Sequence, residues 1–182
     1  MRFLSLTLVT TVFMVTSMLQ ADYSIHLFPV YEGSGDQTKP DIDDDTVVWQ
    51  GGDTNIYWKT GDAEPNAILV DGLQTDPAVS DGVVVWYDQR DSDRDIYGYD
   101  IATDNILIFT EDDGARQRYP DISGPVVVYQ DNTSGSYNLL AHPIGGTASA
   151  VSPVSTHQLN HAIDGTVVVW MEQVGGVYQV FT

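Results

Sequence analysis

The hydrophobic and polar positions of the chain repeat four times with fixed spacing. Each repeat is counted from an anchor residue, with a glutamine three residues before it and an aromatic residue, closing a valine run, nine residues after it. The anchors are Pro40, Pro77, Pro120 and His161, the glutamines are Gln37, Gln74, Gln117 and Gln158, and the aromatic residues are Trp49, Trp86, Tyr129 and Trp170. A tandem repeat of about 40 residues is typical of propeller blades.

The sequence pattern of each repeat predicts one small antiparallel sheet. A short strand with an apolar centre follows the anchor, then a tight turn and a continuous apolar run such as 83–86. Because that run does not alternate, both of its faces should be buried. A third strand that carries tyrosine and a more variable fourth strand follow, and nothing after residue 21 has sustained helical periodicity. The pattern predicts an all-β propeller of four repeats of four-stranded antiparallel blades, at about 40–74, 77–114, 120–155 and 161–182.

Residues 25–31 predict one more strand ahead of the repeats. The segment is rich in aromatic and branched side chains, and its Pro29 suits an outer strand. The fourth repeat ends directly after its third strand, so we expect 25–31 to complete the last blade and close the ring. Two alternatives stay open: a fragment of a longer propeller, and a half-ring that assembles into a larger one, for example as a homodimer.

The first 21 residues have the pattern of a secretory signal peptide. Arg2 precedes an apolar stretch from Phe3 to Met18, and cleavage is expected after Ala21, with cleavage after Ser17 or an uncleaved anchor as alternatives. Residues 22–182 are then long enough for a single β-propeller domain. We expect a secreted, periplasmic or cell-surface protein with no membrane span after the signal peptide is removed.

Charge and composition exclude several classes of function. Asp and Glu number 26 against 7 Lys and Arg, for a net charge of −19, so a nucleic acid would be repelled. The chain has no cysteine, which excludes disulfides and thiolate chemistry. It also has no nucleophile elbow and no phosphate-binding glycine loop. His161 replaces an anchor proline, so we expect a structural role for it.

The segments QTDPAVSDGVVVWYDQR and DIYGYDIAT, at 74–90 and 95–103, resemble the TolB-type, WD40-like propeller repeats of secreted and cell-surface proteins. The resemblance extends over nearly all of 22–182 and implies the propeller fold. It does not imply one function, because such blades serve as docking surfaces for proteins, as carbohydrate-binding modules and as parts of enzymes.

The repeated glutamines and aromatic residues predict structural roles. The glutamines should satisfy backbone groups where the chain enters each blade, and the aromatic residues should fill the space between blades. Aromatic residues outside the repeat pattern are the candidates for stacking on a sugar or another ligand: Trp58, Tyr87 and Tyr119.

Carboxylates on the first strand of each repeat are the candidate metal ligands. Residues one and three past the anchor share a face of the strand, which places Asp41, Asp43, Asp121 and Asp164 toward a central channel. Carboxylates crowded together repel one another or recruit a hard cation, so a channel calcium ion is the cofactor hypothesis. Acids that only cap turns are the alternative.

The sequence favours an exported, non-catalytic binding or scaffold module for a protein or glycan ligand. We expect no catalytic residues. The rival interpretation is a polysaccharide-active enzyme with acidic residues at the channel mouth, which requires two carboxyl groups about 5 to 10 Å apart.

Overall fold

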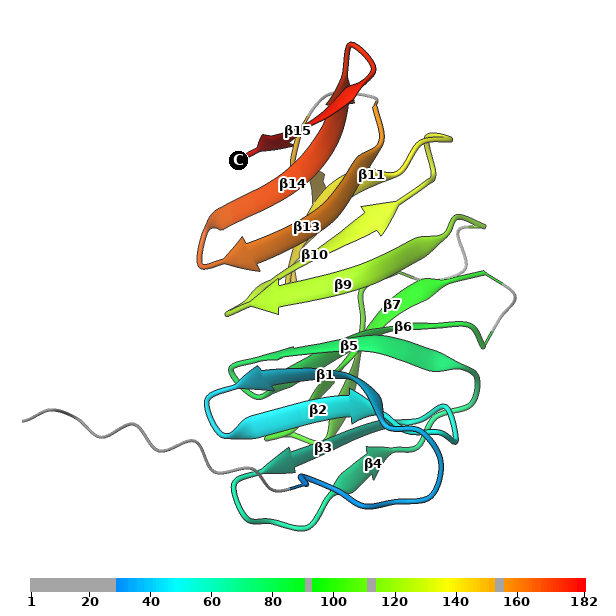
Figure 1. Cartoon of the computed structure of the whole chain (residues 1–182), viewed down its shortest axis with the longest axis vertical. Helices are drawn as coiled ribbons and strands as arrows, with labels where there is room; N and C mark the ends of the chain where they lie inside the picture. The colour runs from blue at the N-terminus through cyan, green and yellow to red at the C-terminus, as the bar shows by residue number, and fades with distance from the viewer. Residues whose placement is uncertain (1–28, 91–92, 111–113, 153–155) are drawn as a thin grey trace, which may run out of the picture. The chain divides into compact units, whose positions relative to one another are not determined.

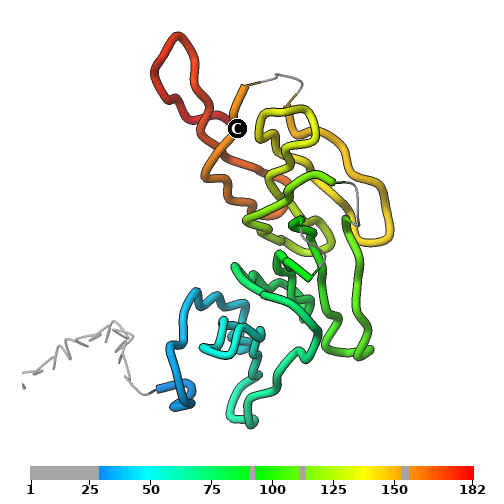
Figure 2. The backbone as a smooth tube through the Cα atoms, turned by 90° about the vertical axis from the view of Figure 1, so that its right-hand side faces the viewer, coloured from blue at the N-terminus to red at the C-terminus, as the bar shows by residue number. Residues whose placement is uncertain are grey.

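Four antiparallel sheets follow one another along the chain in the computed structural model, which describes residues 29–90, 93–110, 114–152 and 156–182 (Figures 1 and 2). The first sheet contains β1 (Thr38–Asp43), β2 (Thr46–Gln50), β3 (Ile56–Thr60) and β4 (Asn66–Ile68). The second contains β5 (Gln74–Ser80), β6 (Val83–Asp88), β7 (Asp95–Asp100) and β8 (Asn105–Ile108). The third contains β9 (Gln117–Ser123), β10 (Val126–Asp131), β11 (Asn138–Pro143) and β12 (Ser149–Ala150). The fourth has three strands, β13 (Gln158–Asp164), β14 (Val167–Val174) and β15 (Val177–Phe181).

The predicted all-β class and the repeat of sheets are confirmed, and the described residues include no helix. The start of the first strand differs from the sequence prediction in every sheet. The first strand of each sheet begins two or three residues before its anchor, so the anchor lies inside the strand. A proline is tolerated there because the strand has a bulge next to it, where the regular ladder is interrupted.

Apolar clusters hold neighbouring sheets together, and each cluster uses the same repeat positions. We call the side of a sheet that carries the valine eight residues past the anchor its forward face, and the side that carries the residue two past the anchor its backward face. The forward valines are Val48, Val85, Val128 and Val169, and the backward residues are Ile42, Val79, Ile122 and Ile163. In all three clusters, the forward valine of one sheet packs with the backward residue of the next.

The repeat aromatic residues Trp49, Trp86, Tyr129 and Trp170 are all buried. Trp86, for example, belongs to the cluster between the first two sheets and stacks on Tyr97 with ring centroids 6.5 Å apart. This burial is expected when neither face of the second strand is exposed to solvent.

Three of the repeat glutamines are fully buried, and Gln74 and Gln158 bond to the backbone of the preceding sheet. Gln74 Oε1 accepts the backbone N–H of Ile56 at 3.1 Å, and Gln158 Oε1 accepts that of Leu139 at 2.7 Å. Gln117 instead donates to the Asp131 carboxylate at 2.7 Å. Gln37 is exposed and accepts the indole N–H of Trp49.

The predicted N-terminal strand lies mostly outside the described residues, as does the whole predicted signal peptide. Of 25–31 only Pro29, Val30 and Tyr31 are described, and they are not in a strand. The Tyr31 ring lies 5.7 Å from Trp49 of the first sheet. Close contacts between sheets run from each to the next along the chain, and the described strands do not join the last sheet to the first. Ring closure therefore stays a prediction.

Candidate functional site

The first strand of every sheet contains a bulge at the same repeat position. In β5, three residue steps from Thr75 to Ala78 oppose two steps on β6, so the strand has one extra residue. The same extra residue occurs in β1, β9 and β13. A bulge re-aims the side chains beside it and often marks a functional position.

The residue just before the anchor adopts a left-handed backbone conformation in all four bulges. Its φ is 52° at Lys39, 52° at Asp76, 53° at Tyr119 and 50° at Asn160. None of the four is glycine, although this conformation costs most other residues about 1–2 kcal/mol, with asparagine and aspartate the most tolerant of it. The same unusual conformation therefore recurs at equivalent positions that carry four chemically different side chains.

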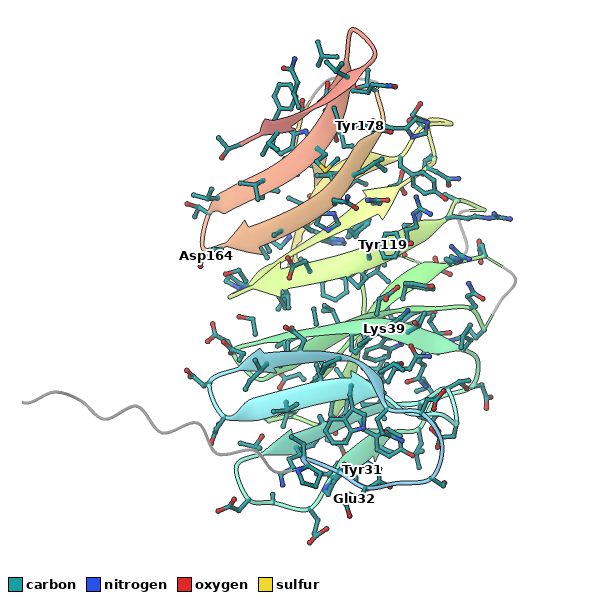
Figure 3. All side chains as sticks on the ribbon, viewed as in Figure 1. Tyr31, Glu32, Lys39, Tyr119, Asp164 and Tyr178 are labelled. Carbon is teal, nitrogen blue, oxygen red and sulfur yellow. The ribbon has the colours of Figure 1, made fainter. Side chains whose placement is uncertain are left out.

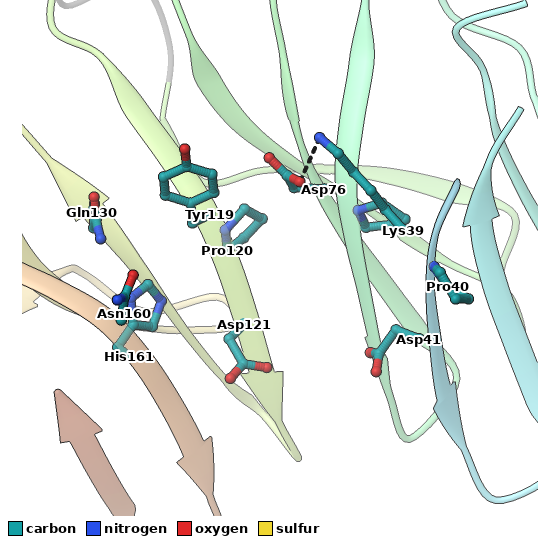
Figure 4. A pocket seen from close by; sticks show the side chains of 11 residues that line it. Lys39, Pro40, Asp41, Asp76, Tyr119, Pro120, Asp121, Gln130, Asn160 and His161 are labelled. Carbon is teal, nitrogen blue, oxygen red and sulfur yellow. Dashed lines mark ion pairs between the residues drawn. The ribbon is translucent and has the colours of Figure 1, made fainter. Parts of the chain in front are cut away.

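These four side chains line one pocket of about 410 Å³, which we call the bulge pocket (Figure 4). The first strands of all four sheets contribute to it, together with one residue of β10. Its lining consists of Lys39, Asp76, Tyr119, Asn160, the four anchors Pro40, Pro77, Pro120 and His161, and Asp41, Asp121 and Gln130. A volume of this size is within the range of small-molecule sites.

Opposite charges meet on one side of the bulge pocket. Lys39 Nζ lies 2.6 Å from Asp76 Oδ1 and donates to Thr75 Oγ1 at 2.6 Å (Figure 4). The other carboxylate oxygen, Asp76 Oδ2, is buried without a hydrogen-bond partner in the described part of the chain. A ligand donor that reached this oxygen would satisfy it.

Tyr119 provides the exposed aromatic surface of the pocket, with 46% of the residue accessible. The Arg118 guanidinium lies 4.9 Å from the ring centroid, and Tyr87 packs edge-on at 6.4 Å. Arg118 is itself fixed by a 3.0 Å hydrogen bond to the buried Gln130. The ring is therefore oriented before any ligand arrives.

Asp41 and Asp121 lie toward the other end of the pocket, and their carboxylates connect sheets (Figure 4). Asp41 Oδ2 accepts the backbone N–H of Val79 at 2.8 Å, and Asp121 Oδ2 accepts that of Ile163 at 3.1 Å. Burial raises the pKa of Asp121, although these backbone bonds partly oppose the shift. Burial has the opposite effect on His161 and lowers its pKa. The Val128 carbonyl and the Asp121 carboxylate partly oppose this decrease.

The residue three past the anchor makes a second connection between sheets. Asp43 Oδ2 accepts the backbone N–H of Asp81 at 2.7 Å, Ser80 Oγ that of Gly124 at 3.0 Å, and Ser123 Oγ that of Gly165 at 2.8 Å. Each acceptor therefore bonds to the turn of the following sheet. Asp164 is the fourth member of this set and is exposed at the end of β13 (Figure 3).

The structure brings some of the predicted site residues together and separates others. Tyr119, Asp41 and Asp121 line the bulge pocket, and Tyr87 contacts Tyr119 while being largely buried. Trp58 lies elsewhere, packed on the cluster between the first two sheets. Asp43 and Asp164 are not among the pocket residues.

Sequence reasoning missed Lys39, Asp76 and Asn160. The signal that identifies them is their position directly before the anchor, where residue type varies although the surrounding offsets are constant. Within the described ranges, no three His, Asp or Glu side chains are grouped closely enough to hold a metal ion. No helix in the described part of the chain has the length and apolar character needed to cross a bilayer.

Comparison of the sequence with protein-family models and with curated proteins finds no match. Solved structures do resemble the chain. TolB from Acinetobacter baumannii matches 80% of it with a TM-score of 0.65 and 16% identity, and the chain covers 40% of TolB. The β-propeller domain of the trilobed protease from Pyrococcus furiosus matches 75% with a TM-score of 0.58 and 14% identity, and the chain covers 46% of that domain.

A computationally designed protein, Ika4, matches 87% of the chain with a TM-score of 0.54 and 15% identity, and the chain covers 98% of it. At these identities the likeness concerns the fold alone. The resemblance to TolB-type repeats in the sequence is thus confirmed at the level of structure, and the chain has a propeller-type fold similar to that of TolB.

Proposed function

We propose that the chain is an exported, non-catalytic propeller module that binds a polar group of a protein or glycan in the bulge pocket. The observation that carries the proposal is the set of four strained bulge residues. A scaffold alone would gain stability from glycine at these positions, whereas the chain has a cation, an anion, an aromatic ring and an amide there.

The contacts of the pocket support binding of a polar ligand. Asp76 Oδ2 is an acceptor without a hydrogen-bond partner in the described part of the chain, and the Tyr119 ring offers an apolar surface in the same pocket. Mixed polar groups on an apolar wall of prolines are typical of ligand sites. Export rests on the signal-peptide pattern of 1–21.

The enzyme alternative has weaker support. Its candidate catalysts, Asp41 and Asp121, each accept a backbone N–H from the next sheet. A carboxylate used in this way is less available as a nucleophile or a proton donor. Release of reducing ends from plant and bacterial polysaccharides would favour this alternative over binding without turnover.

The binding proposal is tested with a glycan array and a peptide array, both probed with the purified chain. Asp76→Asn and Tyr119→Ala should each weaken retention at least tenfold, because they remove the free acceptor and the ring. Asp62→Asn is the matched control, since Asp62 is exposed and outside the pocket. Equal retention of all variants, or no retention of the wild type, would refute the proposal.

Calcium binding by Asp41, Asp43, Asp121 and Asp164 stays a separate prediction. The four side chains do not line one site, because only Asp41 and Asp121 reach the bulge pocket. Titration of metal-stripped protein with calcium, read as a change in melting temperature, tests it. An unchanged melting temperature at millimolar calcium would exclude the ion.

A further inference from the structure

Two sheet faces of this chain are built for a sheet-to-sheet contact that the described residues do not make. On the forward face of the last sheet, Val169 is 39% exposed, whereas its equivalents in the other three sheets are 0% exposed. Val180 on β15 is 76% exposed, whereas its equivalents Ile56, Ile96 and Leu139 are 0% exposed. The fourth sheet thus presents an uncovered copy of a surface that is buried three times elsewhere.

The backward face of the first sheet has the complementary surface. Ile42 is 64% exposed, while Val79 and Ile122, two residues past their anchors, are 4% and 5% exposed. In the three existing clusters this residue packs with the forward valine of the preceding sheet. Ile42 therefore has the same relation to Val169 that Val79 has to Val48.

Hydrogen-bonding groups repeat the same complementarity. Asp43, Ser80 and Ser123 each accept the backbone N–H of the residue four past the next anchor. By this rule, Asp164 on the last sheet is the acceptor for the backbone N–H of Asp44 on the first. Both the apolar and the polar positions of these two faces thus match those that form the contacts between sheets elsewhere in the chain.

We propose that a second copy of this chain covers both faces, so that the forward face of each copy packs on the backward face of its partner. The described residues present one uncovered face of each kind, and the described strands do not bring the two together. A two-fold pair makes the contact twice and leaves neither face open, which is how cyclic dimers close. The first strands of the partner would continue the row β1, β5, β9 and β13 that lines the bulge pocket, so both copies would contribute to that site.

Light scattering on the purified chain at tens of micromolar tests the proposal first. The wild type should have twice the mass of one chain, and Val180→Glu should halve that mass because it buries a charge in the interface. Val177→Glu is the matched control: Val177 is also exposed on β15, but alternation places it on the opposite face. A monomeric wild type, or a dimer that survives Val180→Glu, would overturn the proposal.

Cross-linking distinguishes a second copy from closure of the chain on itself. Because the chain has no cysteine, Ile42→Cys and Val169→Cys introduce the only thiols. An equimolar mixture of the two single variants should give a disulfide-linked dimer under mild oxidation, and a mixture of Ile42→Cys with Val177→Cys should not. A double variant that loses its thiols only as a monomer would show closure within one chain and overturn the proposal.

Discussion

At the scale of single residues, buried and half-buried polar side chains of this protein complete the backbone hydrogen bonds of neighbouring sheets. Gln74 and Gln158 each accept an N–H from a third strand of the preceding sheet. Asp41 and Asp121 do the same for residues of the following sheet. Side chains of adjacent repeats thus supply partners that a single sheet lacks.

Gln74→Leu should lower the free energy of unfolding by about 1–3 kcal/mol, because it leaves the buried N–H of Ile56 without an acceptor. Denaturant unfolding measures the change. Gln179→Leu, at an exposed position of β15, is the control and should change stability by less than about 0.5 kcal/mol. Equal effects of the two substitutions would argue against the role assigned to Gln74.

Asp121 should give the chain a distinct pH dependence. Its pKa in the folded state is raised above the ordinary value of 3.8, so the stability that it contributes is present at lower pH and lost as pH rises through the raised pKa. Asp121→Asn removes this titration. The variant should therefore gain stability relative to wild type between pH 4 and pH 7, measured by denaturant unfolding at each pH. A constant difference across that range would contradict the shift.

At the scale of secondary-structure elements, the bulge divides each first strand into two parts with different contacts. The residues after the anchor pair regularly and carry the contacts between sheets, while the residue before it leaves the ladder and faces the pocket. Because the left-handed conformation disfavours lysine and tyrosine, Lys39 and Tyr119 lower stability at these positions.

Asn160→Gly should raise the free energy of unfolding by a few tenths of a kcal/mol and by less than about 1 kcal/mol, because glycine adopts the φ of 50° without a steric penalty and asparagine with only a small one. Asn105→Gly is the control: this exposed residue lies in β8, where glycine should lower stability by about 0.5–1 kcal/mol. Thermal and denaturant unfolding report both changes. Loss of stability in Asn160→Gly would show that the side chain holds the bulge in place.

At the scale of the whole molecule, the net charge of −19 opposes compactness by self-repulsion. Monovalent salt screens exposed charges over a Debye length of about 10 Å at 0.1 M. The melting temperature should therefore rise between 10 mM and 300 mM sodium chloride at constant protein concentration, with potassium chloride giving the same increase. A fall in melting temperature would mean that attractive pairs such as Lys39 with Asp76 outweigh the repulsion.

The sequence by itself determined the repeat, the strands and the faces of the sheets. Offsets from the anchors predicted the position of nearly every strand, because alternation and continuous apolar runs are local signals of burial. The burial of Trp86 and its equivalents follows from the same pattern, since a run that is apolar on both sides cannot face solvent.

Only the tertiary structure decided the site. Tyr119 could be selected from sequence because an aromatic residue outside the repeat pattern stands out, but Lys39, Asp76 and Asn160 have no local signal of their own. Their convergence depends on bulges and on strands about 40 residues apart in sequence. For the same reason, Asp41, Asp43 and Asp121, three of the four acids expected in a channel, bond to the next sheet: an acceptor finds its donor only when two repeats pack together.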